Sequence, residues 1–302
     1  MYTVQVLLSS YNGERYLREQ IDSILNQKEV NVSLLVRDDG SSDGTVEILK
    51  LYSDKYENVK FISGKNVGVV ASFFELFKLS DNDADYFALS DQDDVWDLDK
   101  LVTACKFLEK TDDKKPAMYS CEALVTDGEM KPLPEKMQIR PKNVRADYRN
   151  ALIENISRGG GIVINKSLME YLRIKLPSDV YMHDWWIYLV ASCFGDVYHD
   201  EKTHYSYRQH SGNVLGAAPG GLSKLVRRLR QSKENKGHIL RQTKSFASVY
   251  DIPAEKMDST NVILKYRESI KWRIKGIFGK LLFRQNKVDD IIFRLMFFTN
   301  HL

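Results

Sequence analysis

Short apolar runs alternate with helix-like apolar repeats through the first 110 residues of this 302-residue chain. The apolar runs predict strands over residues 4–10, 32–37, 59–62 and 86–89. Between and after them, apolar side chains recur every three or four positions, which predicts helices over residues 14–27, 46–52, 70–79 and 98–109. Strands and helices in this order predict an α/β fold, in which a mostly parallel central sheet is flanked by helices on both faces.

Polar residues gather where each of these predicted strands ends. They occupy residues 9–12, 38–40, 66–68 and 91–94, after the first, second, third and fourth strands. Ligands of parallel α/β sheets bind at the carboxyl ends of the strands. We therefore expect these four segments to line one site.

The rest of the chain is less regular. A strand is predicted near residues 117–125, followed by long proline-containing loops, and a further apolar run lies at 162–164. A buried helix over 182–194 and a strand over 203–208 follow, and from about residue 222 the pattern is helical and basic. We divide the chain into a main domain over residues 1–220 and a helical C-terminal region over residues 221–302.

Charge is divided unevenly between these two parts. Residues 221–302 contain 18 Lys and Arg and 7 Asp and Glu. Residues 1–220 contain 26 Lys and Arg and 34 Asp and Glu. The net charge of +3 is therefore the sum of an acidic main domain and a basic C-terminal region. This division suggests chemistry in the main domain and docking in the tail. The three cysteines lack metal-site spacing, and we find neither a secretion signal nor a membrane span, so a cytoplasmic protein is expected.

Asp91, Asp93 and Asp94 place three carboxylates within four residues, directly after the apolar run at 86–89. Like charges this close repel each other unless a cation neutralises them, and hard oxygen ligands suit Mg²⁺ or Mn²⁺. A solvated acidic turn has the same composition, so both interpretations stay open for this run taken alone.

The ends of the first two strands offer groups that can bind a nucleoside. A carboxylate at Asp38 or Asp39 can accept the imide N–H of a uracil or thymine ring, although the local pattern by itself favours a capping turn. Ser9, Tyr11 and Glu14 can line a base and ribose pocket, or they form a strand-to-helix turn.

Weaker signals follow the third strand, precede the apolar run at 162–164 and follow the strand predicted over 203–208. Lys65 and Asn66 place a cation and an amide at the end of the third strand. Gly160 lies in a run of three glycines, which allows the backbone to approach a ligand closely or makes a tight turn before a strand. His210 enters a glycine-containing loop, where it can reach a metal or a diphosphate or be solvated.

Asp184 stands beside Trp185 and Trp186 at the start of the predicted helix over 182–194. Exclusion of water by the indole rings raises the pKa of an acid toward a value useful for a general base, and indole faces stack on sugar rings. The alternative is a helix-capping aspartate with two core tryptophans.

Apolar residues recur at helical spacing in the basic tail, and lysines and arginines lie between them. The apolar positions are Ile263, Tyr266, Ile270, Ile274, Ile277 and Leu281. This pattern fits an interfacial helix attracted to anionic lipid, and it also fits a helix packed on the main domain with a solvated basic face.

Together these motifs resemble the inverting glycosyltransferases of family 2, which have the Rossmann-like GT-A fold. The resemblance covers roughly residues 3–215. It rests on Ser-Tyr-Asn-Gly (10–13), Arg-Asp-Asp-Gly-Ser-Ser-Asp-Gly-Thr (37–45), Asn-Val-Gly (66–68), Ser-Asp-Gln-Asp-Asp-Val-Trp (90–96) and His-Asp-Trp-Trp (183–186). The acidic motif and the late Arg-Gln-His-Ser-Gly-Asn are similar to those of bacterial rhamnosyltransferases that build surface polysaccharides.

The resemblance implies a role for each candidate residue. It assigns a nucleotide-sugar half to about residues 1–115 and an acceptor half to about 116–220. The implied nucleotide-sugar contacts are Ser9, Tyr11, Glu14, Asp38, Asp39, Lys65, Asn66, Asp91 and Gln92; the metal contacts are Asp93 and His210; the catalytic base is Asp184; and the acceptor contacts are Gly160, Trp185 and Trp186. The chain departs from the commoner family pattern at its three consecutive glycines and at His183, where an acid often stands.

The implied donor is a nucleoside diphosphate sugar, with dTDP-rhamnose expected, and the implied cofactor is Mg²⁺ or Mn²⁺. The acceptor is expected to be a glycan or a lipid-linked glycan, with contact to the anionic inner membrane surface and none to nucleic acid. Three alternatives remain: a UDP-hexose donor, a non-catalytic nucleotide- or glycan-binding subunit of a membrane synthase, and a nucleotidyltransferase that makes the donor.

Overall fold

The computed structural model describes residues 1–138, 143–174, 177, 179–210 and 237–299. Its strands are β1 (Tyr2–Ser10), β2 (Val30–Asp38), β3 (Val59–Ser63), β4 (Tyr86–Ser90), β5 (Val95–Trp96), β6 (Ala117–Thr126), β7 (Ile162–Asn165) and β8 (Asp196–Arg208). Within the described residues they form one eight-stranded sheet in the order β3-β2-β1-β4-β7-β6-β8-β5. The expected α/β fold with a central sheet is confirmed.

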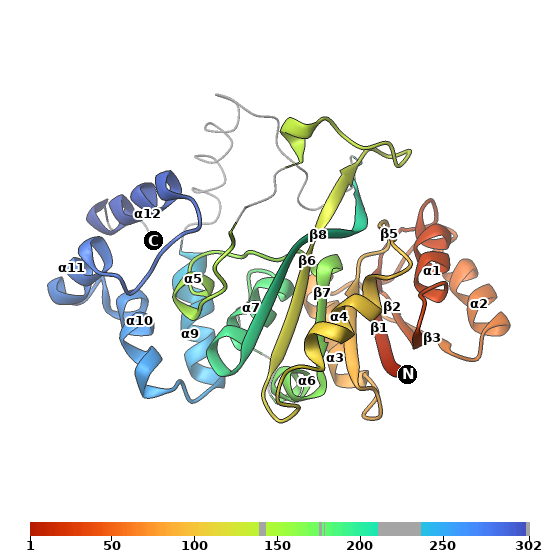
Figure 1. Cartoon of the computed structure of the whole chain (residues 1–302), viewed down its shortest axis with the longest axis horizontal. Helices are drawn as coiled ribbons and strands as arrows, with labels where there is room; N and C mark the ends of the chain where they lie inside the picture. Colours follow the sequence, from red (N-terminus) through yellow and green to blue (C-terminus); the bar gives the residue numbers. More distant parts are fainter. Residues whose placement is uncertain (139–142, 175–176, 178, 211–236, 300–302) are drawn as a thin grey trace.

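Helices cover both faces of this sheet and continue beyond one end of it (Figure 1). Those of the main domain are α1 (Leu17–Leu25), α2 (Thr45–Lys55), α3 (Val69–Leu79), α4 (Lys100–Leu108), α5 (Tyr148–Ala151), α6 (Lys166–Arg173) and α7 (His183–Phe194). Single 3₁₀ turns occur at Glu135–Met137 and Gly159–Gly161. The C-terminal helices are α9 (His238–Val249), α10 (Ala254–Lys265), α11 (Ile270–Phe278) and α12 (Lys287–Thr299).

The first four strands are parallel, and their carboxyl ends lie at nearly the same level in the sheet. β1 lies between β2 and β4, and β2 pairs with β3. In this register Ser10 lies opposite Asp38, Asp38 opposite Ser63, and Leu8 opposite Ser90. The carboxyl ends of all four strands therefore meet at one edge, as their alternation with helices predicts.

The second half of the sheet is mixed. β7 runs antiparallel to both β4 and β6, whereas β8 runs parallel to β6. β8 begins at Asp196, seven residues before the predicted start at 203. Its far end pairs with the two-residue strand β5, which the sequence pattern does not predict. This pairing brings the end of β8 to the segment that follows β4.

The sheet separates two apolar clusters. On one face, β1 contributes Leu7 to a cluster with α3, α6, α7 and the C-terminal helices. On the other face, Val6 and Leu8 join α1, α2 and α4. Because side chains alternate across a strand, one short apolar run serves both clusters.

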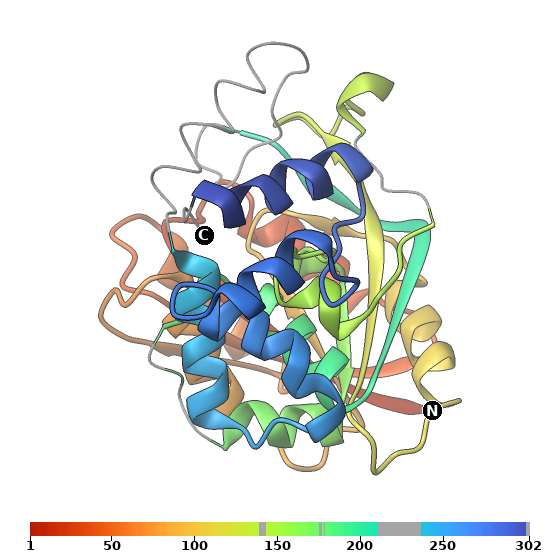
Figure 2. The same ribbon diagram turned by 90° about the vertical axis from the view of Figure 1, so that its left-hand side faces the viewer.

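The C-terminal helices pack side by side against the end of the main domain (Figure 2). Phe246 of α9 meets Trp186 of α7 edge to face, with ring centroids 5.6 Å apart. No helix within the described ranges combines the length and apolar character needed to cross a membrane.

The apolar stripe expected in the tail is divided between two helices. α10 ends at Lys265 and α11 begins at Ile270, so the chain changes direction within the stripe. Ile263 and Tyr266 are buried, whereas Ile270 and Ile274 are exposed. The packed-helix interpretation therefore describes Ile263, Tyr266 and the buried Ile277, whereas the lipid interpretation stays a prediction for the exposed Ile270 and Ile274.

Candidate active site

The acidic loop, residues 91–94, connects β4 to β5 at the edge where the parallel strands end. Asp93 and Asp94 are buried, and Asp91 is partly exposed. Loss of water, together with the charges of Asp93 and Asp184, raises the pKa of Asp91 to about 7. Burial also raises the pKa of Asp94 well above its ordinary value, again with a contribution from Asp93. These carboxyls therefore repel one another inside the protein.

Asp184 lies close to this loop although it is far away in sequence. It occupies the first turn of α7, where its side chain is buried and accepts the backbone N–H of Trp185 at 2.7 Å. Burial raises the pKa of Asp184 to about 6, and hydrogen bonds from Trp185, Asn155 and Gly159 oppose that rise. An acid with this pKa can accept a proton near neutral pH.

The glycine turn, residues 159–161, lies between α7 and the acidic loop. A Cβ added at Gly159 would stand 2.9 Å from Nε2 of His183 and 3.9 Å from Oδ2 of Asp91. At Gly160 it would stand 2.7 Å from Oδ2 of Asp94. The glycines thus make a tight turn and allow the backbone to approach the acidic side chains closely.

His210 is the second predicted metal contact, and it meets Asp93. Nε2 of His210 lies 2.8 Å from Oδ2 of Asp93, and the imidazole packs on the ring of Tyr16 with centroids 4.9 Å apart. Within the described part of the chain, no group of three His, Cys, Asp or Glu residues is arranged to hold a metal. One carboxylate and one imidazole nevertheless fit Mn²⁺ or Mg²⁺, because such ions commonly complete their coordination with substrate phosphates and water.

Arg208 organises the acidic loop from the end of β8. Its Nε donates to the carbonyl of Asp93 at 2.9 Å, and its backbone N–H donates to Oδ1 of Asp94 at 3.3 Å. Its guanidinium also bonds Glu19 and lies over the Tyr16 ring. A cation two positions before His210 was visible in the sequence, but its partners were not.

A second buried cation lies behind the loop. Nζ of Lys100 stands 3.2 Å from the centroid of the Trp96 ring and has no hydrogen-bond partner among the described residues. Burial lowers the pKa of Lys100 to about 8, while the charges of Cys121 and Asp94 oppose this fall. Lys100 and Arg208 together offset part of the negative charge of the loop.

Gln92 joins the acidic loop to the segment that follows β1. Its Oε1 accepts the backbone N–H of Tyr11 at 2.7 Å, and its Nε2 donates to the Tyr11 carbonyl at 3.0 Å. The Tyr11 ring itself is exposed, and Oγ of Ser9 lies 2.7 Å from Oγ of Ser72. In this structure the Gln92 amide holds the backbone at Tyr11, whereas the Tyr11 ring stays exposed to solvent.

Two of the predicted nucleoside contacts cap turns. Asp38 accepts the backbone N–H of Gly40 at 3.2 Å and also bonds the Ser41 hydroxyl. Glu14 accepts the backbone N–H of Gly44 at 3.0 Å, at the start of α2. The capping alternative therefore describes Asp38 as it stands here, and Glu14 makes a bond at the start of α2 that its sequence context did not predict.

Asp39 links the second strand end to the third. Its carboxylate accepts the backbone N–H groups of Val67 at 2.9 Å and Gly68 at 2.8 Å. The segments that follow the first three strands thus lie next to one another. The side chains of Lys65 and Asn66, in the same loop as Val67 and Gly68, stay exposed to solvent.

The two tryptophans after Asp184 are core residues. Trp186 is fully buried against Phe246. Trp185 is also buried, and its Nε1 donates to the carbonyl of Ala151 at 2.6 Å. Their burial corrects the expectation that they meet an acceptor: the core alternative describes both indoles in this structure.

His183 is a site residue to which the sequence assigned no role. Its ring stacks on Phe73 with centroids 3.9 Å apart, and neither ring nitrogen has a hydrogen-bond partner among the described residues. Burial lowers the pKa of His183 to about 3, so the imidazole is neutral near pH 7. With Nε2 facing Gly159, it can offer a neutral donor or acceptor to a ligand.

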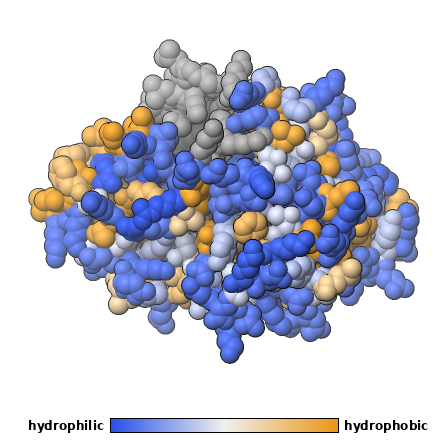
Figure 3. All heavy atoms as spheres, viewed as in Figure 1, coloured by the Kyte–Doolittle hydropathy of each residue, from blue (hydrophilic) through white to orange (hydrophobic). Residues whose placement is uncertain are grey.

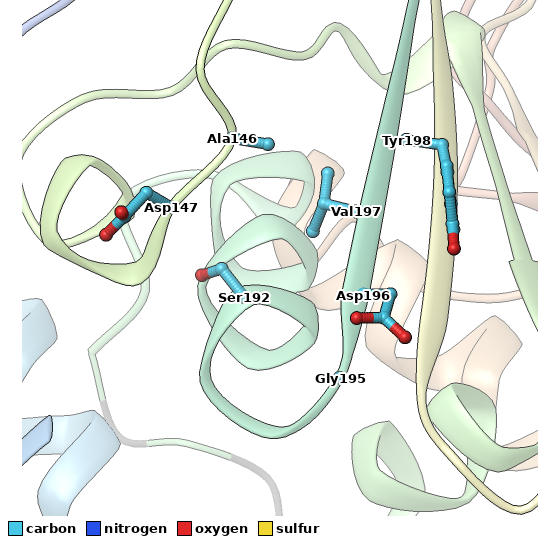
Figure 4. A pocket seen from close by; sticks show the side chains of 7 residues that line it. All are labelled: Ala146, Asp147, Ser192, Gly195, Asp196, Val197 and Tyr198. Carbon is cyan, nitrogen blue, oxygen red and sulfur yellow. The ribbon is translucent and has the colours of Figure 1, made fainter. Parts of the chain in front are cut away.

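A separate pocket lies at the other end of α7 (Figure 4). It is lined by Ala146, Asp147, Ser192, Gly195, Asp196, Val197 and Tyr198. Its acids already have cationic partners: Asp147 pairs with Arg149 at 2.7 Å, and Asp196 pairs with Lys115 at 2.9 Å. We therefore assign no chemistry to this pocket.

The convergence of these segments agrees with the comparison to known families. The family model described as glycosyl transferase family 2 matches residues 5–168, more than half of the chain. The chain belongs to glycosyltransferase family 2. This match includes the acidic loop and the glycine turn, whereas Asp184 and His210 lie beyond it.

This family 2 chain is also similar to a named relative and to solved structures. It is 31% identical over 222 residues to the dTDP-rhamnosyl transferase RfbG of Shigella flexneri, covering 70% of this chain and 74% of RfbG. Its fold is similar to that of TarS from S. aureus, solved with UDP-GlcNAc, at a TM-score of 0.56 and 15% identity, covering 100% and 93% of the two chains. A mannosyltransferase from Pyrobaculum calidifontis, solved with GDP-Man and Mn²⁺, gives a TM-score of 0.55 at 17% identity, covering 85% and 68%.

The close contact at the glycine turn predicts the effect of one methyl group. In Gly160→Ala the new Cβ would press on Asp94, which the Arg208 backbone holds in place. We expect a destabilisation of about 1–3 kcal/mol, which lowers Tm by roughly 2–6 °C in thermal unfolding. Gly128→Ala is the control, because its added Cβ would meet only the Tyr16 hydroxyl at 3.5 Å. Equal Tm values for the two variants would contradict this packing.

Proposed function

We propose that this chain is an inverting, divalent-metal-dependent rhamnosyltransferase. It transfers L-rhamnose from dTDP-rhamnose to a hydroxyl of a glycan or lipid-linked glycan acceptor in bacterial surface polysaccharide synthesis. The observation that carries the proposal is that Asp93 and Asp184 both approach Asp91 at the carboxyl edge of the sheet. One acid with a raised pKa near a carboxylate–imidazole pair suits base catalysis beside a bound diphosphate.

The choice of donor rests on the relatives. RfbG, which shares 31% identity over 70% of this chain, is named as a dTDP-rhamnosyl transferase. The structures of similar fold were solved with UDP-GlcNAc and with GDP-Man and Mn²⁺. These bound ligands support a nucleoside diphosphate sugar as the class of donor and a divalent cation as cofactor, and the similarity to RfbG favours rhamnose.

The proposed reaction is a single in-line displacement. Asp184 accepts the proton of the acceptor hydroxyl as that oxygen attacks the anomeric carbon of the donor. The bond from this carbon to the nucleoside diphosphate breaks on the opposite face, so the configuration inverts. A divalent ion held by Asp93 and His210 would offset the charge that builds on the leaving diphosphate.

The other residues of the site hold this arrangement in place. Arg208 and Lys100 offset charge within the acidic loop, and Gln92 ties that loop to the segment carrying Tyr11. The exposed Tyr11 and Lys65 remain our candidates for contacts to the nucleotide. We further propose that the basic C-terminal region brings the enzyme to the anionic inner face of the membrane.

A non-catalytic nucleotide- or glycan-binding subunit is the competing function. Such a protein needs a nucleotide site but no base. The raised pKa of Asp184 and its place beside Asp91 favour the enzyme. A UDP-hexose donor differs from dTDP-rhamnose in the transferred sugar, in the nucleobase and in the 2′-hydroxyl of the ribose, and binding experiments separate the two.

The donor can be tested by thermal shift. In the presence of Mn²⁺, dTDP-rhamnose is expected to raise Tm more than UDP-glucose or UDP-GlcNAc, because only a bound ligand stabilises the folded state. Mass spectrometry of a glycan acceptor would then detect transfer. A larger rise in Tm with a UDP-sugar would make that sugar the donor in place of dTDP-rhamnose. Binding of a nucleotide sugar without transfer to any acceptor would favour the non-catalytic alternative.

Removal of the proposed base should slow the reaction without weakening nucleotide binding. Asp184→Asn is expected to lower kcat by about 10²-fold or more, with Kd for dTDP nearly unchanged. Because burial raises the pKa of Asp184 to about 6, its carboxylate is lost as pH falls through this value, and wild-type kcat/KM should fall about ten-fold per pH unit below it.

The control for this experiment is Asp196→Asn, at the opposite end of α7, where the carboxylate pairs with Lys115. It should keep wild-type kinetics. Full activity of Asp184→Asn would exclude Asp184 as the base.

Replacement of Asp93 should separate metal-dependent from metal-independent binding. Asp93→Ala is expected to abolish most of the gain in dTDP affinity that Mn²⁺ gives the wild type, measured by titration calorimetry with and without the ion. Asp93→Asn keeps the shape of the side chain if the alanine variant is unstable. The exposed Asp97 provides the control variant, Asp97→Ala. An unchanged Mn²⁺ effect in both Asp93 variants would remove this residue from the metal site.

A further inference from the structure

Helix α11 presents an apolar face to solvent. Ile270, Ile274 and Phe278 are 74%, 52% and 75% exposed, and their spacing of four places them on one side of the helix. Gly276 and Ile277 of the same helix are buried, and Ile277 borders the exposed residues because it lies one turn after Ile274. The exposed face is therefore additional to the one that α11 uses to pack.

Helix α12 likewise has one side that packs in the protein and one side that is exposed to solvent. Its packing side carries Phe293 and Phe297, which are buried, and a Cβ added at Gly276 of α11 would stand 2.6 Å from the Phe297 ring. Its outer side carries a stripe of exposed apolar residues, namely Val288, Ile291, Ile292, Leu295 and Phe298. The two helices thus pack against each other through these buried residues and leave other large apolar side chains exposed to solvent.

These two exposed faces form one surface. The rings of Phe278 and Phe298 meet edge to face with centroids 6.5 Å apart. Figure 3 shows hydrophobic atoms gathered at the end of the molecule where Figure 1 places α11 and α12. We call Ile270, Ile274, Phe278, Ile291, Leu295 and Phe298 the α11–α12 surface. Contiguous apolar patches of this kind mark interaction sites.

Basic residues lie among these apolar side chains. Residues 265–294 contain nine Lys and Arg and three Asp and Glu. Lys271, Lys280 and Lys287 are exposed on or beside the two helices. An apolar face combined with lysines and aromatic rings is the composition of helices that lie in the interface of an anionic bilayer.

The same charge disfavours a second copy of the chain as the partner. A symmetric dimer through the α11–α12 surface would bring two patches of the same net positive charge together, and like charges at an interface weaken association. An anionic lipid surface supplies the complementary charge and accepts the apolar side chains. Of the two, the lipid surface satisfies both features of the patch.

We propose that the α11–α12 surface docks the enzyme on anionic phospholipid. Ile270, Ile274, Phe278, Leu295 and Phe298 enter the head-group region, and the neighbouring lysines meet lipid phosphates. This inference rests on the proposed function in one respect, because it explains how a transferase would reach a lipid-linked acceptor. Its test measures lipid binding, so its failure is distinguishable from the absence of glycosyl transfer.

The experiment is vesicle co-sedimentation of the full chain. Wild-type protein is expected to bind vesicles of mixed phosphatidylcholine and phosphatidylglycerol, to bind phosphatidylcholine vesicles weakly, and to lose affinity as salt rises. The double variant Phe278→Ser with Leu295→Ser should lower affinity about ten-fold or more. The double variant Lys271→Glu with Lys280→Glu should lower affinity only for the anionic vesicles.

Matched controls come from the opposite end of the molecule. Leu51 on α2 is 56% exposed and Leu295 is 54% exposed, so Leu51→Ser removes a similar apolar group without effect on vesicle binding. Lys50→Glu with Lys60→Glu repeats the charge change on exposed lysines elsewhere. Thermal unfolding confirms that each variant is folded.

Three results would overturn the proposal. In the first, wild-type protein does not bind anionic vesicles. In the second, the control variants lose as much vesicle affinity as the surface variants. In the third, the protein does not bind vesicles but forms a dimer in solution, and Phe278→Ser with Leu295→Ser abolishes that dimer. The last result, read by analytical ultracentrifugation, would assign the surface to a second copy of the chain.

Discussion

Arg208 joins the end of β8 to the acidic loop, and the geometry of the site depends on this contact. Two carboxyls of the loop are buried beside each other, which is unfavourable without cations. The guanidinium bonds the Asp93 carbonyl while the Arg208 backbone bonds Asp94, and Lys100 adds a second positive charge from behind. Since Arg208 also leads directly to His210, one strand end both stabilises the loop and brings an imidazole to Asp93.

Helix α7 connects the hydrophobic core to the proposed chemistry. Trp186 fixes the helix in the core, and Asp184, two residues earlier in the same first turn, faces the acidic loop. The glycine turn allows this approach, because any side chain at Gly159 or Gly160 would occupy the space of His183 or Asp94. The raised pKa of Asp184 is thus a consequence of core packing: the same burial that stabilises α7 removes water from its first acid.

The C-terminal helices extend this core to the far end of the molecule. One apolar cluster includes α3, α7, α9 and residues as far as Phe297 of α12. α9 packs on Trp186, α10 and α11 follow, and α12 closes the series. The surface proposed to meet lipid is therefore connected through packed side chains to the helix that carries Asp184, so docking would orient the site as well as concentrate the enzyme.

The sequence by itself determined the first half of the fold and the candidate acids of the site. Periodicity located β1 to β4 and their helices because apolar spacing records which side of an element is buried, and the acids after β4 were evident from composition. The partners of these residues were decided only in three dimensions. Asp38 and Glu14 cap turns, Trp186 enters the core, Arg208 and His183 join the site, and the tail stripe divides between α10 and α11. Local patterns report burial, whereas hydrogen-bond partners depend on segments that are brought together by the sheet order, and no spacing along the chain encodes that order.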